Sequence, residues 1–167
     1  MTKQEQLHSL CMDMIAYDGG DPARIQHFLK VHAFGVLIAE AEGVDDHTKY
    51  IIEAVTYVHD VGIRAAIQKY GHQTWKLQEE LGPEPARRLL EKNGFEEKDI
   101  GRICWLVGHH HTFDNIEGDD YQILVEADFL VNLFERNTSK EAKESAFEKY
   151  FRTNTGRKIF RTMFENC

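Results

Sequence analysis

Apolar and polar residues alternate with a helical period over most of this chain. In the segment DPARIQHFLKVHAFGVLIAEAEG, apolar side chains recur every three or four positions, which places His27 and Ile38 on one helical face. Asp21 suits an N-cap, Pro22 suits the first helical position, and Gly43 suits the end of a helix. The pattern therefore predicts a long helix that begins near Pro22 and ends near Gly43.

The same period predicts further helices, separated by glycine and asparagine signals. A break is expected near Gly62, and the pair Asn93–Gly94 suits the end of another helix. The predicted ranges are about 46–60, 83–93, 97–108 and 120–135. Because β-type alternation never persists for more than a few residues, the pattern predicts an all-α protein.

The C-terminal part is predicted to be helical as well. A helix is expected to begin at Thr138, because Glu141 three positions later completes a capping box. Apolar residues continue as far as Phe164, which indicates that residues 138–167 pack on the rest of the chain. With 167 residues and no linker or repeat, we predict one domain, a bundle of about six to seven helices.

Composition and charge then narrow the function classes. A net charge of −8 without any Lys/Arg block argues against binding to duplex nucleic acid, whereas a small phosphorylated ligand needs only a few cations. No apolar run approaches the length of a membrane span, and the N-terminus lacks the apolar core of a signal peptide. Cys11, Cys104 and Cys167 are widely spaced, which predicts free thiols and a cytoplasmic protein.

Several metal-ligating residue types fall on the apolar faces of the predicted helices. The set comprises His27, His59, Asp60, His110 and Asp128. Asp128 stands out because the stretch EADFLVNLF places a carboxylate among buried apolar positions. A charge in such a position costs several kcal/mol unless it is paired or bound to a metal. Helical bundles build metal sites from side chains that converge in this way.

Each of these residues also has a structural interpretation. His27 alone suits a hydrogen-bonded core histidine, the pair His59–Asp60 suits a helix cap, and Asp128 suits a pair with an arginine. The run His109–His111 suits a solvated helix end. Their coincidence on three helices favours a metal site. Nitrogen and oxygen ligands without a thiolate suit Mn, Mg, Fe, Co, Ni or Zn.

The order of these residues resembles the HD-domain superfamily of metal-dependent phosphohydrolases. The segments RIQHFLKV, AVTYVHDVG and VEADFLVN contain, in order, His27, then His59 and Asp60, then Asp128. The resemblance covers roughly residues 20–135 and implies an HD-type helical bundle in which these four side chains bind a divalent metal. It further implies that water activated by the metal hydrolyses a phosphate ester.

The resemblance also implies candidates for a second metal. In RICWLVGHHHTF, His110 is the best match to a family histidine, and His111 is the next. The family often has a further histidine before a glycine, but here Leu81 precedes Gly82. Three nearby side chains are candidate substitutes: Glu79, Glu80 and His72. One metal is therefore favoured, and a second, bridged by Asp60, is the alternative.

Further residues are expected to contact the substrate. The family's cation after the His-Asp pair is displaced by one position to Arg64, which is expected to hold phosphate and to complete a catalytic set with Asp60 and His110. Three more residues are candidates: Asn132, one turn beyond Asp128, and the cations Arg24 and Lys30 beside His27. A solvated helix flank is the alternative for the cations.

The sequence thus predicts a metal-dependent phosphohydrolase for a small phosphorylated molecule, with a nucleotide as one candidate. Two alternatives remain open: a non-haem di-iron oxygenase, which requires a second metal, and a non-catalytic sensor of nucleotide or metal. Because histidine ligands must be neutral, activity is expected to fall below about pH 6. The sequence leaves the substrate, the metal and the oligomeric state open.

Overall fold

The computed structural model describes residues 1–165, and every regular element in this range is an α-helix. The ten helices are α1 (Lys3–Tyr17), α2 (Pro22–Glu42), α3 (Asp46–Val58), α4 (Gly62–Tyr70), α5 (Trp75–Leu81), α6 (Pro83–Lys92), α7 (Glu97–Val107), α8 (Asp119–Glu135), α9 (Lys140–Tyr150) and α10 (Asn154–Phe164). The all-α class is confirmed.

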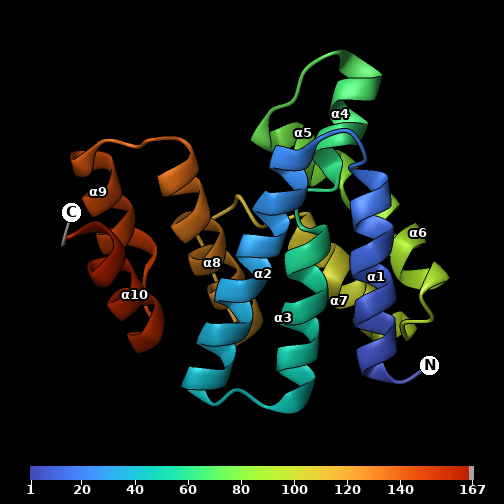
Figure 1. The fold of residues 1–167 in the computed structure, drawn as a ribbon, viewed down its shortest axis with the longest axis horizontal. Helices are drawn as coiled ribbons and strands as arrows, with labels where there is room; N and C mark the ends of the chain where they lie inside the picture. The colour runs from blue at the N-terminus through green and yellow to red at the C-terminus, as the bar shows by residue number, and fades with distance from the viewer. Residues whose placement is uncertain (166–167) are drawn as a thin grey trace.

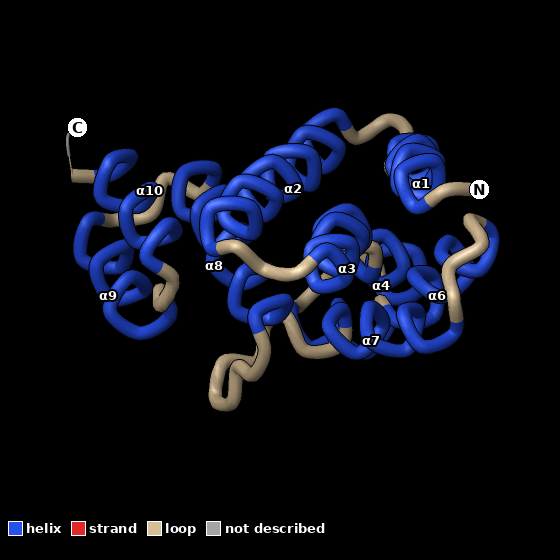
Figure 2. The backbone as a smooth tube through the Cα atoms, turned by 90° about the horizontal axis from the view of Figure 1, so that it is seen from below, coloured by secondary structure: helices blue, strands red, loops and turns tan. Residues whose placement is uncertain are grey.

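Helices α2, α3 and α8 form the centre of the fold (Figure 1). Each of the three contacts the other two, and α3 also packs against α1 and α7. Viewed from below, α9 and α10 lie at one end of the molecule, while α1 and α6 lie at the other end (Figure 2). The central helices therefore carry the side chains that meet in the middle of the bundle.

The ends of the central helices follow the signals in the sequence. The Asp21 side chain accepts a hydrogen bond from the backbone of Arg24, and Pro22 begins α2. Gly43 ends α2 with a φ of 69°, a left-handed conformation that favours glycine. Asp45 caps α3 in the same manner as Asp21 caps α2. These caps set where α2 and α3 begin and how the chain turns between them.

The prediction of six to seven helices was too low. Helix α1 was missed although Leu7, Leu10 and Met14 recur at helical spacing on its buried face and a capping box joins Thr2 and Glu5 at its start. Helices α4 and α5 have nine and seven residues, too short for a period of 3.6 to be visible. The cap predicted at Thr138 lies at Ser139, whose hydroxyl accepts from the backbone of Ala142.

Glycine allows α4 and α5 to pack closely together. The break predicted near Gly62 is confirmed: α3 ends at Val58, and Gly62 is the first residue of α4. A Cβ atom at Gly62 would collide with the carbonyl oxygen of Gln78, and one at Gly82 would meet the same oxygen. Only glycine lets the two backbones approach so closely. This contact brings α5 next to the turn that follows α3.

A buried carboxylate in α8 anchors the C-terminal helices. Glu126 is fully buried and accepts hydrogen bonds from the backbone N–H groups of Arg152 and Thr153, from the Thr153 hydroxyl, and from Gln122. Burial raises the pKa of Glu126. Helix α10 contacts both α2 and α8, and an aromatic cluster of Phe147, Phe151 and Phe160 fills this part of the core.

Two remaining expectations concern the cysteines and the membrane. Cys11 and Cys104 are free thiols, and burial raises the pKa of the Cys104 thiol to about 11. Cys167 lies outside the described residues. Across the described part of the chain, no helix combines the length and apolar character needed to span a membrane.

Replacement of Glu126 by alanine is expected to destabilise the protein by about 3 kcal/mol, because it leaves the hydrogen-bond donors around the carboxylate buried without an acceptor. Chemical denaturation followed by circular dichroism measures this loss. Glu148→Ala is the matched control, since Glu148 is exposed and its ion pair with Arg161 contributes less than about 1 kcal/mol. Equal unfolding midpoints for the two variants would contradict this role of Glu126.

Candidate metal centre

The His59–Asp60 pair lies where α3 ends and the chain turns into α4. His59 is fully buried, and its Nδ1 lies 2.8 Å from the carbonyl oxygen of Thr56 in the last turn of α3. A proton on Nδ1 is donated to this carbonyl, which leaves the lone pair of Nε2 free to face the interior. The helix end therefore fixes both the orientation of the ring and its tautomer.

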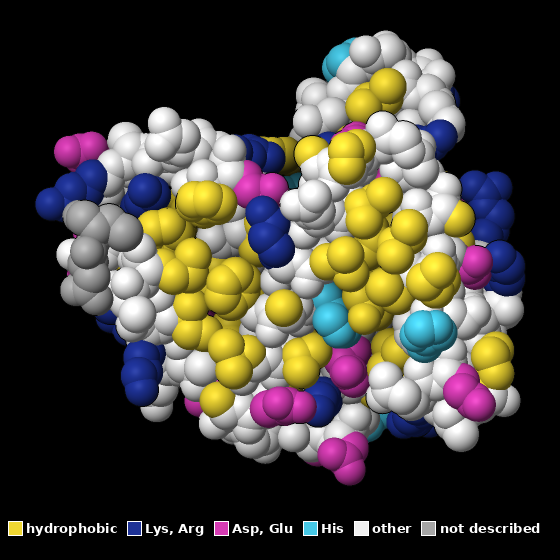
Figure 3. All heavy atoms as spheres, viewed as in Figure 1, with side chains coloured by type: hydrophobic (Ala, Val, Ile, Leu, Met, Phe, Trp, Pro, Cys, Tyr) yellow, Lys and Arg dark blue, Asp and Glu magenta, His cyan; other side chains and the backbone are white. Residues whose placement is uncertain are grey.

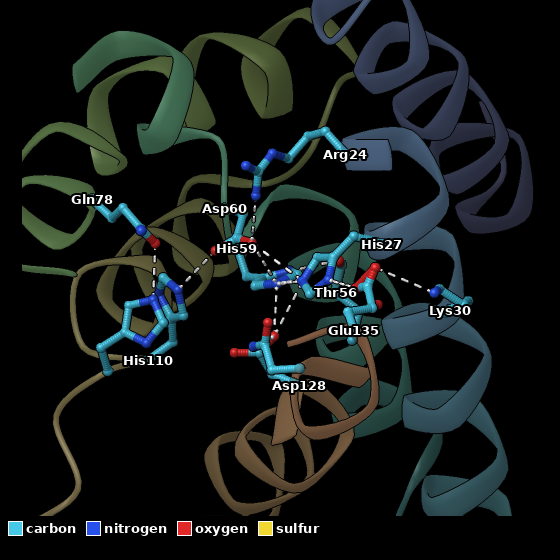
Figure 4. Close-up of polar contacts among 12 residues, drawn as sticks. Arg24, His27, Lys30, Thr56, His59, Asp60, Gln78, His110, Asp128 and Glu135 are labelled. Carbon is cyan, nitrogen blue, oxygen red and sulfur yellow. Dashed lines mark hydrogen bonds and ion pairs between the residues drawn. The ribbon is translucent and has the colours of Figure 1, made fainter. Parts of the chain in front are cut away.

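Two further side chains meet this pair from the neighbouring central helices (Figure 4). His27 of α2 places its Nε2 3.2 Å from Asp60 Oδ2 and 3.2 Å from Asp128 Oδ1 of α8. His59 Nε2 lies 3.5 Å from Asp60 Oδ2 and 3.4 Å from Asp128 Oδ1. The two imidazole Nε2 atoms are 3.4 Å apart. All four side chains predicted as ligands therefore converge at one point.

This arrangement fits a metal ion. Metal–ligand bonds of about 2.0–2.2 Å place neighbouring ligand atoms roughly 3.0–3.5 Å apart in octahedral to tetrahedral geometry. The five distances between the donor atoms, 3.2 to 3.5 Å, fall in this range. The group is also nearly dry, since the exposed fractions of the four side chains are 0 to 11%. The donor set of two imidazoles and two carboxylates suits a divalent ion.

Outer contacts hold the ligand side chains in place. His27 Nδ1 lies 2.5 Å from Glu135 Oε1, and Lys30 pairs with the other oxygen of Glu135 at 3.3 Å. Asn132 donates from Nδ2 to Asp128 Oδ1 at 2.8 Å. Such partners fix the tautomer of a ligating histidine and the rotamer of a ligating carboxylate.

The electrostatics of the cluster also favour a cation. Burial acts to raise the pKa of Asp60 and Asp128, but the surrounding histidines outweigh it and hold both carboxyl pKa values well below their usual range. Burial acts to lower the pKa of His27, but Asp128 and Asp60 outweigh it and raise this pKa to about 11. Two ionised carboxylates thus retain a proton on His27 unless another cation takes its place.

A second group of ligand-type side chains shares Asp60. His110 is buried in the turn that follows α7, and its Nε2 lies 3.3 Å from Asp60 Oδ1, the carboxylate oxygen that does not contact His27 or His59. His110 Nδ1 lies 2.8 Å from the Val107 carbonyl oxygen, and Asp60 raises the pKa of His110 against the effect of burial. His111 belongs to the same group, and burial lowers its pKa to about 3.

In the described part of the chain, the three side chains suggested as substitutes for a further metal ligand are not part of the group formed by Asp60, His110 and His111. Glu79 accepts hydrogen bonds from the His111 backbone and from the Thr112 hydroxyl. His72 and Glu80 are exposed. The buried side chain in this region is Gln78, whose Oε1 lies 2.9 Å from His111 Nε2. Gln78 was missed because no ligand motif includes glutamine and only the close α4–α5 packing buries it.

The three cations predicted to contact the substrate lie at different distances from the His/Asp group. Arg24 Nη1 lies 3.4 Å from Asp60 Oδ2, at the edge of the metal centre. Lys30 pairs with Glu135. Arg64 lies over the ring of Tyr17, with its guanidinium carbon 5.7 Å from the ring centroid, and in the described part of the chain no hydrogen bond or ion pair connects it to the ligand side chains.

Sequence reasoning also missed Glu135 and a pocket beside the centre. Glu135 lies seven residues after Asp128, a helical spacing that was available as a signal. The pocket is lined in part by Asp128, Trp75 and Arg136. The latter two residues are distant in sequence, and no local pattern indicates that they face each other.

Comparisons with known proteins place the fold. No protein-family profile matches the sequence, and no curated protein matches it significantly. One similar solved structure is described as a predicted HD superfamily hydrolase from an uncultured Thermotogales bacterium, with 23% identity and a TM-score of 0.65 over 98% of this chain and 85% of that chain. Another is YpgQ from Bacillus subtilis, with 16% identity and a TM-score of 0.68 over 99% of this chain and 89% of that chain.

These likenesses confirm the resemblance at the level of the fold. The protein shares its helical fold with these two structures, and its own structure contains His/Asp groups that could hold a metal ion. At identities below 25% the likeness concerns the fold alone.

Replacement of Asp128 by alanine is expected to abolish high-affinity binding of divalent metal, because it removes an anionic ligand from the centre of the group. Wild-type protein should unfold at a higher temperature with Mn²⁺ than with EDTA, by the linkage of binding to stability. Thermal melts and metal analysis after desalting measure both effects. Asp46→Ala, an exposed change at the start of α3, should retain metal and the thermal shift. Full metal occupancy in the Asp128 variant would contradict the assignment.

Metal affinity is expected to rise with pH between about pH 6 and 8. Because the pKa of His27 is raised to about 11 without metal, the proton on Nε2 must leave before this nitrogen can bind an ion. For each proton that the metal displaces, the apparent affinity for the metal rises about tenfold per pH unit. Calorimetry in two buffers of different ionisation enthalpy counts the released protons. A pH-independent affinity without proton release would show that His27 is not a ligand.

Proposed function

We propose that this protein is a divalent-metal-dependent phosphohydrolase that acts on a small phosphorylated molecule, with a nucleotide as one candidate substrate. The observation that carries the proposal is the convergence of His27, His59, Asp60 and Asp128 within 3.2–3.5 Å, beside a pocket that Asp128 also lines. The likeness to a structure described as a hydrolase supports it. A bound divalent ion supplies two effects there: it lowers the pKa of water and neutralises phosphoryl oxygens.

The protein side chains have separate tasks in this proposal. Asp60 and Asp128 provide the negative charge that retains the ion, and Asn132 keeps the Asp128 carboxylate oriented by its hydrogen bond of 2.8 Å. Arg24 has a partly exposed side chain beside Asp60, so its remaining N–H groups are available to a phosphate. The phosphate contact expected for Arg64 stays a prediction, since its guanidinium lies over the ring of Tyr17.

His110 is proposed as the proton donor to the leaving oxygen. Its Nδ1 is committed to the Val107 carbonyl, so the proton that the raised pKa retains is on Nε2, next to Asp60. Nε2 is therefore the atom that can transfer a proton to the leaving group. If a second ion binds between Asp60, His110 and His111, His110 is instead a ligand of that ion.

The test is a screen of phosphomonoesters, nucleotides and cyclic nucleotides with protein of known metal content. Hydrolysis with bound Mn, Mg, Co or Ni is expected, and Asp60→Ala should abolish it while leaving helicity intact. Asp46→Ala, an exposed change at the start of the helix that precedes Asp60, serves as the control. Two bound irons, uptake of O₂ and no hydrolysis would overturn the proposal in favour of an oxygenase. Metal and nucleotide binding without turnover would indicate a sensor.

His110→Gln separates the two roles of His110. As a proton donor, its loss should lower kcat about 100-fold or more with unchanged metal stoichiometry, and the effect should be smaller for substrates with a good leaving group. Metal analysis and kinetics on esters with leaving groups of different pKa measure this. A fall in stoichiometry from two ions to one would instead assign His110 as a ligand.

A further inference from the structure

A cavity of about 160 Å³ adjoins the candidate metal centre, and its walls include three large aromatic side chains. We call it the aromatic pocket; the residues used below are Trp75, His111, Phe113, Phe129, Asn132 and Arg136. The metal-centre residues Asp128 and His110 also line it. In the space-filling view, a hollow separates the lobe formed by α4 and α5 from the α8–α9 end of the molecule, with Lys or Arg side chains at its rim (Figure 3).

Trp75 presents a flat apolar surface at this pocket. The residue is 54% exposed, although it has one of the largest apolar side chains in the protein. Its ring is nearly parallel to His111, with centroids 5.6 Å apart and an interplanar angle of 20°. The guanidinium carbon of Arg136 lies 6.0 Å from the centroid of the Trp75 ring. A tryptophan held between elements in this way is well placed to stack on a planar ligand.

The position of Arg136 connects the aromatic pocket to the phosphate side of the metal centre. Arg136 and Asn132 line both the aromatic pocket and a neighbouring cavity of about 180 Å³ that is lined by Arg24 and His27. The two cavities therefore flank the metal centre and meet at these shared residues. A molecule with its phosphate at the metal centre has an aromatic surface on one side of it and Arg24 on the other.

The side chains that line the aromatic pocket indicate which class of ligand it binds. Phe113 and Phe129 have ring centroids 5.3 Å apart and form an apolar wall that offers no hydrogen bonds to a sugar. Trp75 and Arg136 offer a π-face and a planar cation, and both groups stack on nucleobases. We propose that the aromatic pocket binds the nucleobase of a nucleoside monophosphate whose phosphate lies at the metal centre. This inference rests on the proposed function for the position of the phosphate.

Binding is tested first by fluorescence, without reference to turnover. The chain has two tryptophans, and Trp105 lies on α7 stacked on His109, so Trp105→Phe leaves Trp75 as the single reporter. AMP and CMP should change its emission in a saturable manner, while ribose 5-phosphate and inorganic phosphate should not. Equal responses to AMP and ribose 5-phosphate, or no response to either, would overturn the inference.

Kinetics provide the second test. Trp75→Leu should raise KM for AMP by about 5- to 150-fold, the range expected for loss of one base-stacking contact, and leave hydrolysis of ribose 5-phosphate unchanged. Trp105→Leu is the matched control and should leave kcat/KM unchanged for both AMP and ribose 5-phosphate. An unchanged ratio of kcat/KM for AMP over ribose 5-phosphate in Trp75→Leu would overturn the base site even if hydrolysis itself is confirmed.

The two proposals fail in different ways. If no phosphate ester is hydrolysed but AMP still changes Trp75 emission and ribose 5-phosphate does not, the proposed hydrolase function is wrong and the base site is supported. If both esters are hydrolysed at rates that do not depend on Trp75, the function is supported and the base site is wrong.

Discussion

The structure depends on two carboxylates buried between helices. Asp60 and Asp128 lie close to His27 and His59 in the centre of the bundle, where an unpaired charge would cost several kcal/mol. Their compensation comes from imidazole contacts and, in our proposal, from a metal ion. Because α2, α3 and α8 each contribute to the cluster, this electrostatic requirement and the packing of the central helices support each other.

The surroundings of the cluster are adapted to this requirement. The Nδ1 atom of each histidine proposed as a ligand has an acceptor: the Thr56 carbonyl for His59 and the Glu135 carboxylate for His27. Val31, one turn beyond His27 in α2, packs with Ala127 and Val131, which lie on either side of Asp128 in α8, and these buried side chains exclude water there. A dry, oriented donor set of this kind strengthens the interaction of its charges with a cation. The same environment would act on a phosphoryl group beside it.

Helices outside the centre determine access to the site. The glycine contact between α4 and α5 brings Trp75 close to His111, while Arg136 follows the last residue of α8. The carboxylate of Glu126 binds the connection between α9 and α10, which holds these two helices on the side of α8 that faces away from α3 (Figure 2). Helix α8 therefore connects three features of the protein: the candidate metal centre, the pocket beside it and the C-terminal helices.

The sequence by itself determined the helical class, the caps of α2 and the residues proposed as ligands. These features depend on local spacing: Asp21 and Pro22 act within one turn, and Asp128 is conspicuous on an apolar face. Only the tertiary structure decided which side chains support and surround the cluster. The contact of His27 with Glu135 spans 108 residues, and that of His111 with Gln78 spans 33. Such pairs arise from the packing of helices against each other, which no periodicity within one helix specifies.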